Sequence, residues 1–325
     1  MGTPDTRAYL DGALCDQGFP VADVSEHLEK PGVVIWVDLC SPSAEELHDL
    51  ADELGLHELA VEDALEPHQR PKLDYYGTHL FLSCHDVRLD RDSQTIAKTE
   101  IDAFIGKGWL ITVRSDDQFS MTAVQDRCER SSDLARSGVA YFVYGLLDVI
   151  VDNYFDVLNE FDDFFDMVSE GIFADQPINP SDQRRWFEMR RSLVQFHRLV
   201  GPIREAVSSL MRRQHNAIPE ELYPYFQDVY DHTLRVAEST DALRDLVTTI
   251  VETNLSLRDY RQNQVMKKVT SWAAIIAVPT LITGYYGMNL PYPGFETHWG
   301  VVVSIVLMVG LSLALYLSFK RRGWL

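Results

Sequence analysis

Two uncharged apolar stretches near the end of the chain constrain its fold more than any other feature. Residues 269–286 read VTSWAAIIAVPTLITGYY and residues 299–319 read WGVVVSIVLMVGLSLALYLSF, with no charged side chain in either. A helix needs roughly 20 apolar residues to cross the hydrocarbon core of a bilayer. We therefore expect a transmembrane domain over 266–325, with spans at about 266–287 and 299–319 and a short outer loop at 288–298.

The charged residues are divided unequally between this region and the rest of the chain. Of 29 basic and 49 acidic side chains, residues 266–325 hold five and one, which leaves a net charge of −24 elsewhere. The basic residues Lys267, Lys268 and 320–322 flank the two spans, and the loop between the spans has no Lys or Arg. By the positive-inside rule we expect both termini in the cytoplasm of a cell (inner) membrane protein. The N-terminal residues also lack the apolar core of an export signal.

The same acidity argues against nucleic acid as a partner, because phosphate binding requires clustered Lys and Arg. The sequence contains no dinucleotide-binding, P-loop or nucleophile-elbow motif, so we expect no enzymatic activity. Its four cysteines form no CxxC pair, which is typical of a reducing compartment. No protein partner other than further copies of the chain is indicated.

Residues 1–140 predict a small domain of strands and helices. The run GVVIWVDL at 32–39 predicts a buried strand, and Ser43 with Glu46 matches the capping box that opens a helix. Residues 79–89 and 99–115 predict three strands, with a turn at 106–108 between the last two. A further helix is expected over 116–136.

From residue 140 the apolar residues recur at helical spacing, which predicts a helical region over 141–265. An acidic amphipathic helix of about 30 residues is followed by a second helix over 182–214. No proline lies between Pro224 and Pro279. One helix can therefore extend from Tyr225 to Val278, ~80 Å at 1.5 Å per residue. Such a helix would connect the acidic domain mechanically to the first span.

Two spans in one chain cannot enclose a water-filled path, so conduction would require several chains around an axis. One stripe of the first span and its approach is smaller and more polar than the opposite stripe. This composition suits either a pore wall or close packing of membrane helices. The stripe consists of Asn263, Met266, Val269, Ala273, Ala277, Thr280 and Gly284.

The outer end of the first span reads Tyr286-Gly287-Met288-Asn289, and this YGMN resembles the signature of the CorA family of magnesium channels. Residues 62–72, 225–232 (YFQDVYDH) and 319–325 (FKRRGWL) also resemble segments of that family. The resemblance implies an α+β cytosolic domain joined by a very long stalk helix to an all-α two-span transmembrane domain. It further implies a homopentameric funnel in membrane lipid, with the first span lining the pore.

The resemblance assigns a selectivity filter to Gly287, Met288 and Asn289. Mg²⁺ gives up its water shell reluctantly, and neutral amide and carbonyl oxygens can hydrogen-bond those waters and still release the ion. The small, polar stripe then lines the pore. Ala277 stands where the family commonly has a bulkier residue. The hydrophobic constriction of the pore would then be formed by Met266 and Val269 instead.

The family closes when cytosolic Mg²⁺ is plentiful, through carboxylates that bridge neighbouring subunits. The resemblance places Asp228 on one side of such a bridge and Asp90 on the other, with Asp148 nearby. Glu252 would form an acidic ring lower in the pore or a solvent-exposed surface.

The outer loop keeps one acid, Glu296, which five copies would turn into an anionic ring. His298 beside it suits softer ions such as Zn²⁺ or Co²⁺.

Three functions follow from these observations. The first is a channel for Mg²⁺ that is gated by cytosolic Mg²⁺. The second is a proton-coupled zinc or cobalt transporter of the same superfamily. The third is a membrane-anchored metal sensor that conducts nothing.

Overall fold

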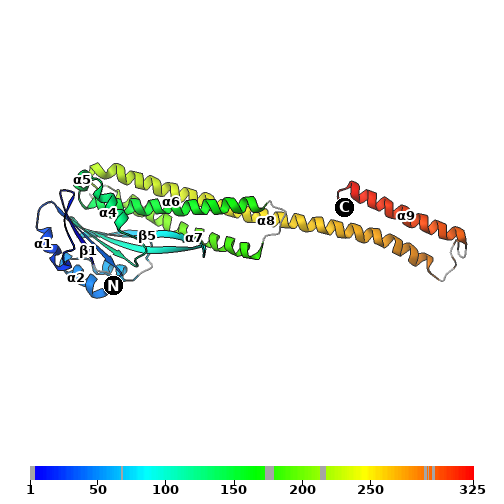
Figure 1. The fold of residues 1–325 in the computed structure, drawn as a ribbon, viewed down its shortest axis with the longest axis horizontal. Coiled ribbons are helices and arrows are strands. Elements are labelled where there is room, and N and C mark those ends of the chain that lie inside the picture. Colours follow the sequence, from blue (N-terminus) through cyan, green and yellow to red (C-terminus); the bar gives the residue numbers. More distant parts are fainter. Residues whose placement is uncertain are drawn as a thin grey trace. The chain divides into compact units, whose positions relative to one another are not determined.

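The computed structural model describes residues 4–66, 69–172, 179–212, 217–288, 291, 293–294 and 297–325. The chain divides into two compact units, Met1–Val247 and Thr248–Leu325, called unit 1 and unit 2 below. Unit 1 contains a β-sheet with helices, and unit 2 contains the two apolar stretches as helices (Figure 1).

Unit 1 is built on a seven-stranded sheet with the order β2-β1-β3-β7-β6-β5-β4. Its strands are β1 (Asp5–Leu10), β2 (Ala13–Gln17), β3 (Val33–Cys40), β4 (Lys72–Tyr76), β5 (His79–Asp90), β6 (Thr95–Ile105) and β7 (Trp109–Arg114). Only the β3–β7 pair is parallel. The strands predicted over 32–39, 79–89 and 99–115 are confirmed as β3, β5, β6 and β7, and the turn lies at 106–108 as expected.

The hairpin of β1 and β2 was not predicted, although its turn carries a clear signal. Asp11 and Gly12 have φ of 50° and 81°, and Asp-Gly is favoured where a two-residue turn needs positive φ at both positions. A Cβ on Gly12 would lie 2.1 Å from the carbonyl oxygen of Ser132. Glycine is therefore required both by the turn and by the segment packed against it.

One face of the sheet is covered by α1 (Val24–Leu28), α2 (Ala44–Leu54) and α3 (Glu58–Leu65). Alternate residues of β3, namely Ile35, Val37 and Leu39, share a core with Leu47 and Leu50 of α2. The predicted capping box of α2 is confirmed: the Ser43 hydroxyl accepts from the backbone N–H of residue 46 at 3.2 Å. The carboxylate of that glutamate in turn accepts from the Ser43 N–H at 2.8 Å.

The other face carries α4 (Thr122–Glu129), α5 (Ser132–Ala135), α6 (Val139–Ile172) and α7 (Pro180–Leu210). Trp36 of β3 packs on Phe142 of α6 at 5.9 Å between ring centroids, and Figure 1 shows α6 lying over the strands. The helix expected over 116–136 is confirmed only in part: residues 122–129 and 132–135 form α4 and α5, whereas residues 116–121 are not helical. Its first residues form a turn because the Asp116 carboxylate accepts from the Thr99 hydroxyl at 2.7 Å and from the N–H of residue 118 at 2.9 Å.

Helices α6 and α7 form the two long helices expected after residue 140. Phe196 of α7 packs between Tyr154 and Phe161 of α6, with ring centroids 5.5 and 5.9 Å away. Asn179 caps α7 by accepting from the N–H of Ser181 at 3.3 Å. The helix ends at Leu210, and the predicted end at residue 214 lies outside the described residues.

The very long helix is confirmed as α8, Tyr223–Tyr286, which has 64 residues. It continues through Pro279, which lacks the N–H that would bond the preceding turn. Prolines within membrane-spanning helices are tolerated where the surroundings and small local adjustments accommodate the lost bond. Two hydroxyls beside Pro279 bond to other carbonyls of the same helix. Thr280 donates to the carbonyl of Ile276 at 3.0 Å, and Thr283 donates to that of Thr280 at 3.1 Å.

Unit 2 contains the end of α8 and α9 (His298–Arg321), whose cap Thr297 accepts from the N–H of Gly300 at 3.3 Å. Both helices are long and apolar enough to cross a membrane, and only 11% and 6% of their most apolar windows are buried. They are therefore not core helices of unit 2. Large apolar side chains such as Ile276 and Leu281 are exposed along them.

Polar side chains are buried within the sheet where β5 and β6 pair. Ser83 lies opposite Asp102, and His85 lies opposite Glu100. Asp102 is only 3% exposed, and this burial raises the pKa of its carboxyl to about 8. A cavity of about 120 Å³ adjoins Asp102 and Glu100. Unit 1 therefore contains a carboxyl group that folds in its protonated form at neutral pH.

Candidate metal cluster and candidate pore helix

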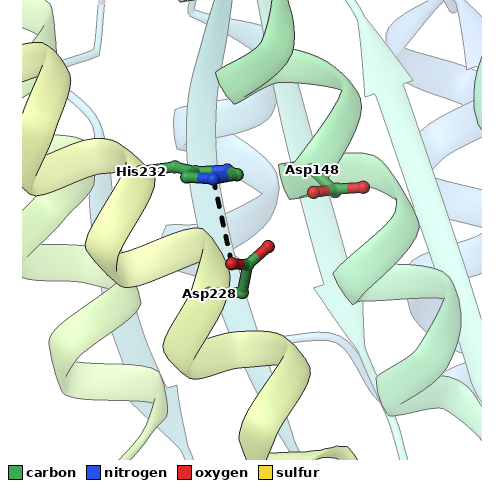
Figure 2. Close-up of side chains that lie close together, drawn as sticks. All are labelled: Asp148, Asp228 and His232. Atoms are coloured by element: carbon green, nitrogen blue, oxygen red, sulfur yellow. Dashed lines mark ion pairs between the residues drawn. The ribbon is translucent and has the colours of Figure 1, made fainter.

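Three side chains that suit a metal ion meet between α6 and α8 in unit 1 (Figure 2). Asp148 comes from α6, and Asp228 and His232 come from α8. One ligand atom from each residue lies within 4.8 Å of the other two. Two carboxylates and one imidazole are a ligand set that divalent cations such as Mg²⁺, Co²⁺ and Zn²⁺ accept. We call these three residues the metal cluster.

Helix geometry explains why two members of the metal cluster lie together. Asp228 and His232 are four residues apart, so they share one face of α8, and His232 Nε2 lies 3.8 Å from the Asp228 carboxylate. The ring of Phe155 on α6 packs edge-on against His232 at 5.6 Å. This contact fixes the imidazole beside α6. Its Nδ1 is buried without a hydrogen-bond partner among the described residues.

The positive charge nearest to the metal cluster is Arg127 of α4. One of its guanidinium nitrogens pairs with Asp148 and another with Asp152, the latter at 2.8 Å. Asp148 is buried, whereas Asp228 is exposed. A bound cation would therefore compete with Arg127 for Asp148 and approach from the side of Asp228. Burial raises the pKa of the neighbouring Tyr144, and the charge of Asp228 adds to that rise.

The predicted residue Asp90 is not part of this cluster within one chain. It ends β5, where its carboxylate accepts from the N–H of Asp92 at 2.9 Å and from the Ser93 hydroxyl at 2.8 Å. These hydrogen bonds lower the pKa of Asp90. Its neighbour Arg91 pairs with Glu160, more than three turns along α6 from Asp148. The structure thus joins Asp148 to Asp228, and a bridge from Asp90 to another subunit stays a prediction.

His232 was missed at the level of sequence, although it lies in the quoted segment YFQDVYDH. The signal was its spacing of four residues from Asp228, which places a carboxylate and an imidazole on one helix face. Asp148 joins these two residues only because α6 packs against α8, and no local sequence pattern indicates that contact.

The predicted pore stripe lies on one exposed side of α8. All seven of its residues are exposed in the single chain, as are Trp272 and Ile276 of the opposite stripe, so exposure alone does not distinguish the two stripes. A face that no part of unit 2 covers is free to meet water or another subunit. Glu252 is also exposed. The seven exposed residues are Asn263, Met266, Val269, Ala273, Ala277, Thr280 and Gly284.

The predicted filter follows directly on the end of α8 at Tyr286. The N–H of Gly287 donates to the carbonyl of Thr283 at 2.8 Å, and the N–H of Met288 donates to that of Tyr285 at 3.3 Å. A Cβ on Gly287 would lie 2.9 Å from the Thr283 carbonyl oxygen, so this tight turn favours glycine. Asn289 and Glu296 lie outside the described residues.

These features define a class of protein. A sheet-and-helix unit continues through one long helix into two exposed apolar helices, each long enough to cross a membrane, and candidate metal ligands lie on the first of these helices. This combination is typical of a membrane protein that handles metal ions. The chain belongs to the CorA family, because the model of the CorA-like Mg2+ transporter protein family matches residues 31–321.

Individual relatives agree with this assignment. The chain is 31% identical over 273 residues to the Cobalt/magnesium transport protein CorA of Thermotoga maritima, covering 83% of this chain and 77% of the relative. It is 28% identical to the Putative metal ion transporter YfjQ of Bacillus subtilis, covering 92% of each. The complete structure of the CorA magnesium transporter from Methanocaldococcus jannaschii superposes with a TM-score of 0.78 at 22% identity, covering 100% of this chain and 99% of that one.

Proposed function

We propose that copies of this chain assemble into a divalent-cation channel that admits Mg²⁺ through the cell (inner) membrane. The observation that carries the proposal is α8, which bears Asp228 and His232 near one end and the exposed stripe from Asn263 to Gly284 near the other. Membership of the CorA family and the names of the relatives support Mg²⁺ as the ion.

The proposed pore is a ring of chains, a homopentamer in membrane lipid, with both termini in the cytoplasm. The stripe lines it, and Gly287, Met288 and Asn289 form its filter. Neutral oxygens there hold the waters of a hydrated Mg²⁺ without trapping the ion. Glu296 forms an anionic ring in the outer loop. In this arrangement residues 1–140 and 141–265 are the cytosolic parts and residues 266–325 the transmembrane domain.

The proposed regulation uses the metal cluster. Acidic domains arranged in a ring repel one another, and divalent cations that bind their carboxylates lower this repulsion. Mg²⁺ at Asp148, Asp228 and His232, with Asp90 from a neighbouring subunit, would favour a closed ring when Mg²⁺ is plentiful. Loss of the ion would shift the population toward an open ring.

Co²⁺ is the second candidate ion, and His232 is the observation that favours it. An imidazole ligand suits Co²⁺ and Zn²⁺ better than Mg²⁺, which prefers oxygen. The Thermotoga maritima relative is named as a cobalt/magnesium transport protein. A proton-coupled transporter for such ions requires a pH gradient, whereas a channel does not. A metal sensor without flux is the third possibility.

The test is Mg²⁺ entry into liposomes that contain the full chain, compared with Asn289→Ala and with Gln17→Ala as a control at an exposed amide of β2. We expect rapid Mg²⁺ entry that Asn289→Ala reduces at least tenfold and Gln17→Ala leaves unchanged. Absence of flux in assembled protein would favour the sensor.

A further inference from the structure

The two helices of the α6–α7 hairpin carry opposite charges that do not pair with each other. Helix α6 contains no basic residue, and its acids at 156, 162, 163, 166 and 170 are exposed. Helix α7 exposes arginines at 184, 185, 190, 191 and 198. No ion pair joins α6 to α7 among the residues that the structure describes. Within the described part of the chain, the exposed acids of α6 and the exposed arginines of α7 named above therefore do not neutralise one another.

Each helix gathers part of these residues into a stripe. Residues seven apart in a helix lie two turns apart on nearly the same face, about 10.5 Å from each other. The three charged residues of each stripe are spaced seven apart, and each stripe also contains one apolar residue on the same face. The acidic stripe is Asp156, Asp163, Met167 and Glu170, and the basic stripe is Arg184, Phe187, Arg191 and Arg198.

The two apolar members stand out by their exposure. Met167 is 69% exposed and Phe187 is 66% exposed, more than any other large apolar side chain described in unit 1. Met167 lies one turn from Asp163, and Phe187 lies one turn from Arg184. Each charged stripe thus contains an uncovered apolar side chain.

The stripes lie on opposite outer sides of the hairpin. Its inner side is marked by Phe196 of α7, which packs between Tyr154 and Phe161 of α6. Asp163 is nine residues from Tyr154, which is two and a half turns and therefore the opposite face of α6. Arg191 is five residues from Phe196, which also places it well away from the inner side of α7. One hairpin cannot bring its own stripes together.

The stripes are nevertheless level with each other along the hairpin. Phe196 marks the level of residues 157–158, midway between its two partners on α6. Because the two helices are antiparallel and have the same rise per residue, each step backward along α7 corresponds to one step forward along α6 at the same height. Arg198 falls level with Asp156, and Arg191 with Asp163. The same count matches Phe187 with Met167 and Arg184 with Glu170.

We infer that the acidic stripe of one subunit docks against the basic stripe of the next subunit. This inference rests on the homo-oligomer proposed above. If the symmetry axis of the ring is parallel to the hairpin, rotation from one subunit to the next leaves the height of each residue along the axis unchanged. A contact between two different surfaces, repeated around the axis, then closes the ring. Three ion pairs then form at each interface, between 156 and 198, 163 and 191, and 170 and 184.

The same contact covers the exposed apolar side chains. Met167 meets the Phe187 ring of the neighbouring subunit, and thioether–aromatic contacts are favourable. The neighbouring arginines also neutralise a crowded acidic surface. Burial and the charges of Asp166 and Asp163 raise the pKa of Asp162 on the same helix.

Charge reversal tests the ion pairs in the full chain in detergent. One variant carries Asp156→Arg, Asp163→Arg and Glu170→Arg, a second carries Arg184→Glu, Arg191→Glu and Arg198→Glu, and a third carries all six changes. Exposed ion pairs contribute about two- to fivefold each. The oligomer of each single-stripe variant should therefore dissociate roughly tenfold to hundredfold more readily, as measured by native mass spectrometry. The variant with all six changes should regain the stability of the wild-type oligomer. Reversal of Glu45, Asp49 and Asp52 on α2 is the matched control.

Cysteine crosslinking tests the contact itself. With Cys15 and Cys40 replaced by serine, Met167→Cys together with Phe187→Cys should form disulfides between subunits and give a ladder of oligomers. The control pair is Met167→Cys with Leu59→Cys, because Leu59 is 55% exposed on α3 and lies outside both stripes.

The outcomes separate this inference from the proposed function. Equal crosslinking of both pairs, or an oligomer unchanged by either single-stripe variant, overturns the interface while Mg²⁺ flux stands. A chain that is monomeric throughout and conducts nothing overturns both. Loss of bound anionic lipid from the Arg→Glu variant, with an unchanged oligomer and equal crosslinking of both cysteine pairs, would assign the basic stripe to lipid and overturn the interface.

Discussion

Replacing the buried carboxyl of Asp102 by an amide should change how stability depends on pH. The pKa of Asp102 is raised to about 8 by burial in the folded chain, against about 3.9 in an unfolded chain. Between about pH 4 and about pH 8, Asp102 is therefore protonated in the folded chain and ionised in the unfolded chain. The wild-type protein loses stability as pH rises from about 4 to about 8, by 1.36 kcal/mol per pH unit at most. Asp102→Asn removes this dependence because the amide does not ionise.

The expected size follows from that interval. At pH 7 the wild-type protein should have lost about 4 kcal/mol relative to pH 4 through this one group, and about 1 kcal/mol more by pH 9. Glu100 and Asp63 oppose ionisation of Asp102, and Lys72 favours it. The net direction stays that of burial, so the stability of Asp102→Asn relative to the wild type should rise steadily above pH 4.

Pulse proteolysis of the full chain in detergent, with urea from pH 5 to pH 9, measures this difference. The urea midpoints of the two proteins should diverge steadily as the pH rises. Asp92→Asn is the control, because Asp92 is exposed in the turn between β5 and β6, and it should leave the wild-type profile unchanged. Parallel profiles for the wild type and Asp102→Asn would refute the reasoning.

The metal cluster and the filter give further predictions. Arg127→Gln should raise Mg²⁺ affinity severalfold in calorimetry, because Asp148 loses its competing cation, while Arg130→Gln should not; equal affinities would contradict this. His232→Asn should weaken Co²⁺ binding at least tenfold and Mg²⁺ binding less, since imidazole suits the softer ion; an equal loss for both would argue against His232 as a ligand. Gly287→Ala should slow Mg²⁺ entry into liposomes, because the added Cβ meets a carbonyl oxygen of the last turn of α8.

The parts of the fold that follow local patterns were predictable. The apolar run of β3, the capping box at Ser43 and the proline-free stretch of α8 are each read within a short window of sequence, and all three are confirmed. The hairpin of β1 and β2 was missed because its strands are short and mixed in polarity, and β2 is exposed along its length. The helix expected from residue 116 begins only at Thr122, because the carboxylate of Asp116 bonds a strand and a turn instead.

The candidate site divides in the same way. The stripe on α8 has helical periodicity, so sequence placed its members on one face. The single chain leaves both this face and the opposite one exposed, and the pore role of the stripe stays a prediction. The metal cluster combines residues from two helices far apart in the chain, and only their packing brings Asp148 to Asp228 and His232. The resemblance had grouped Asp90 with Asp228 and Asp148, and the bridge from Asp90 to another subunit stays a prediction.

The central claim is that this chain conducts Mg²⁺ down its own gradient. The most direct measurement is the current through the reconstituted protein in a planar bilayer with unequal Mg²⁺ on the two sides. We predict a current whose reversal potential follows the Mg²⁺ gradient and does not move when a pH gradient is imposed. A reversal potential that follows the pH gradient, or a current carried by Zn²⁺ or Co²⁺ alone, would contradict the account.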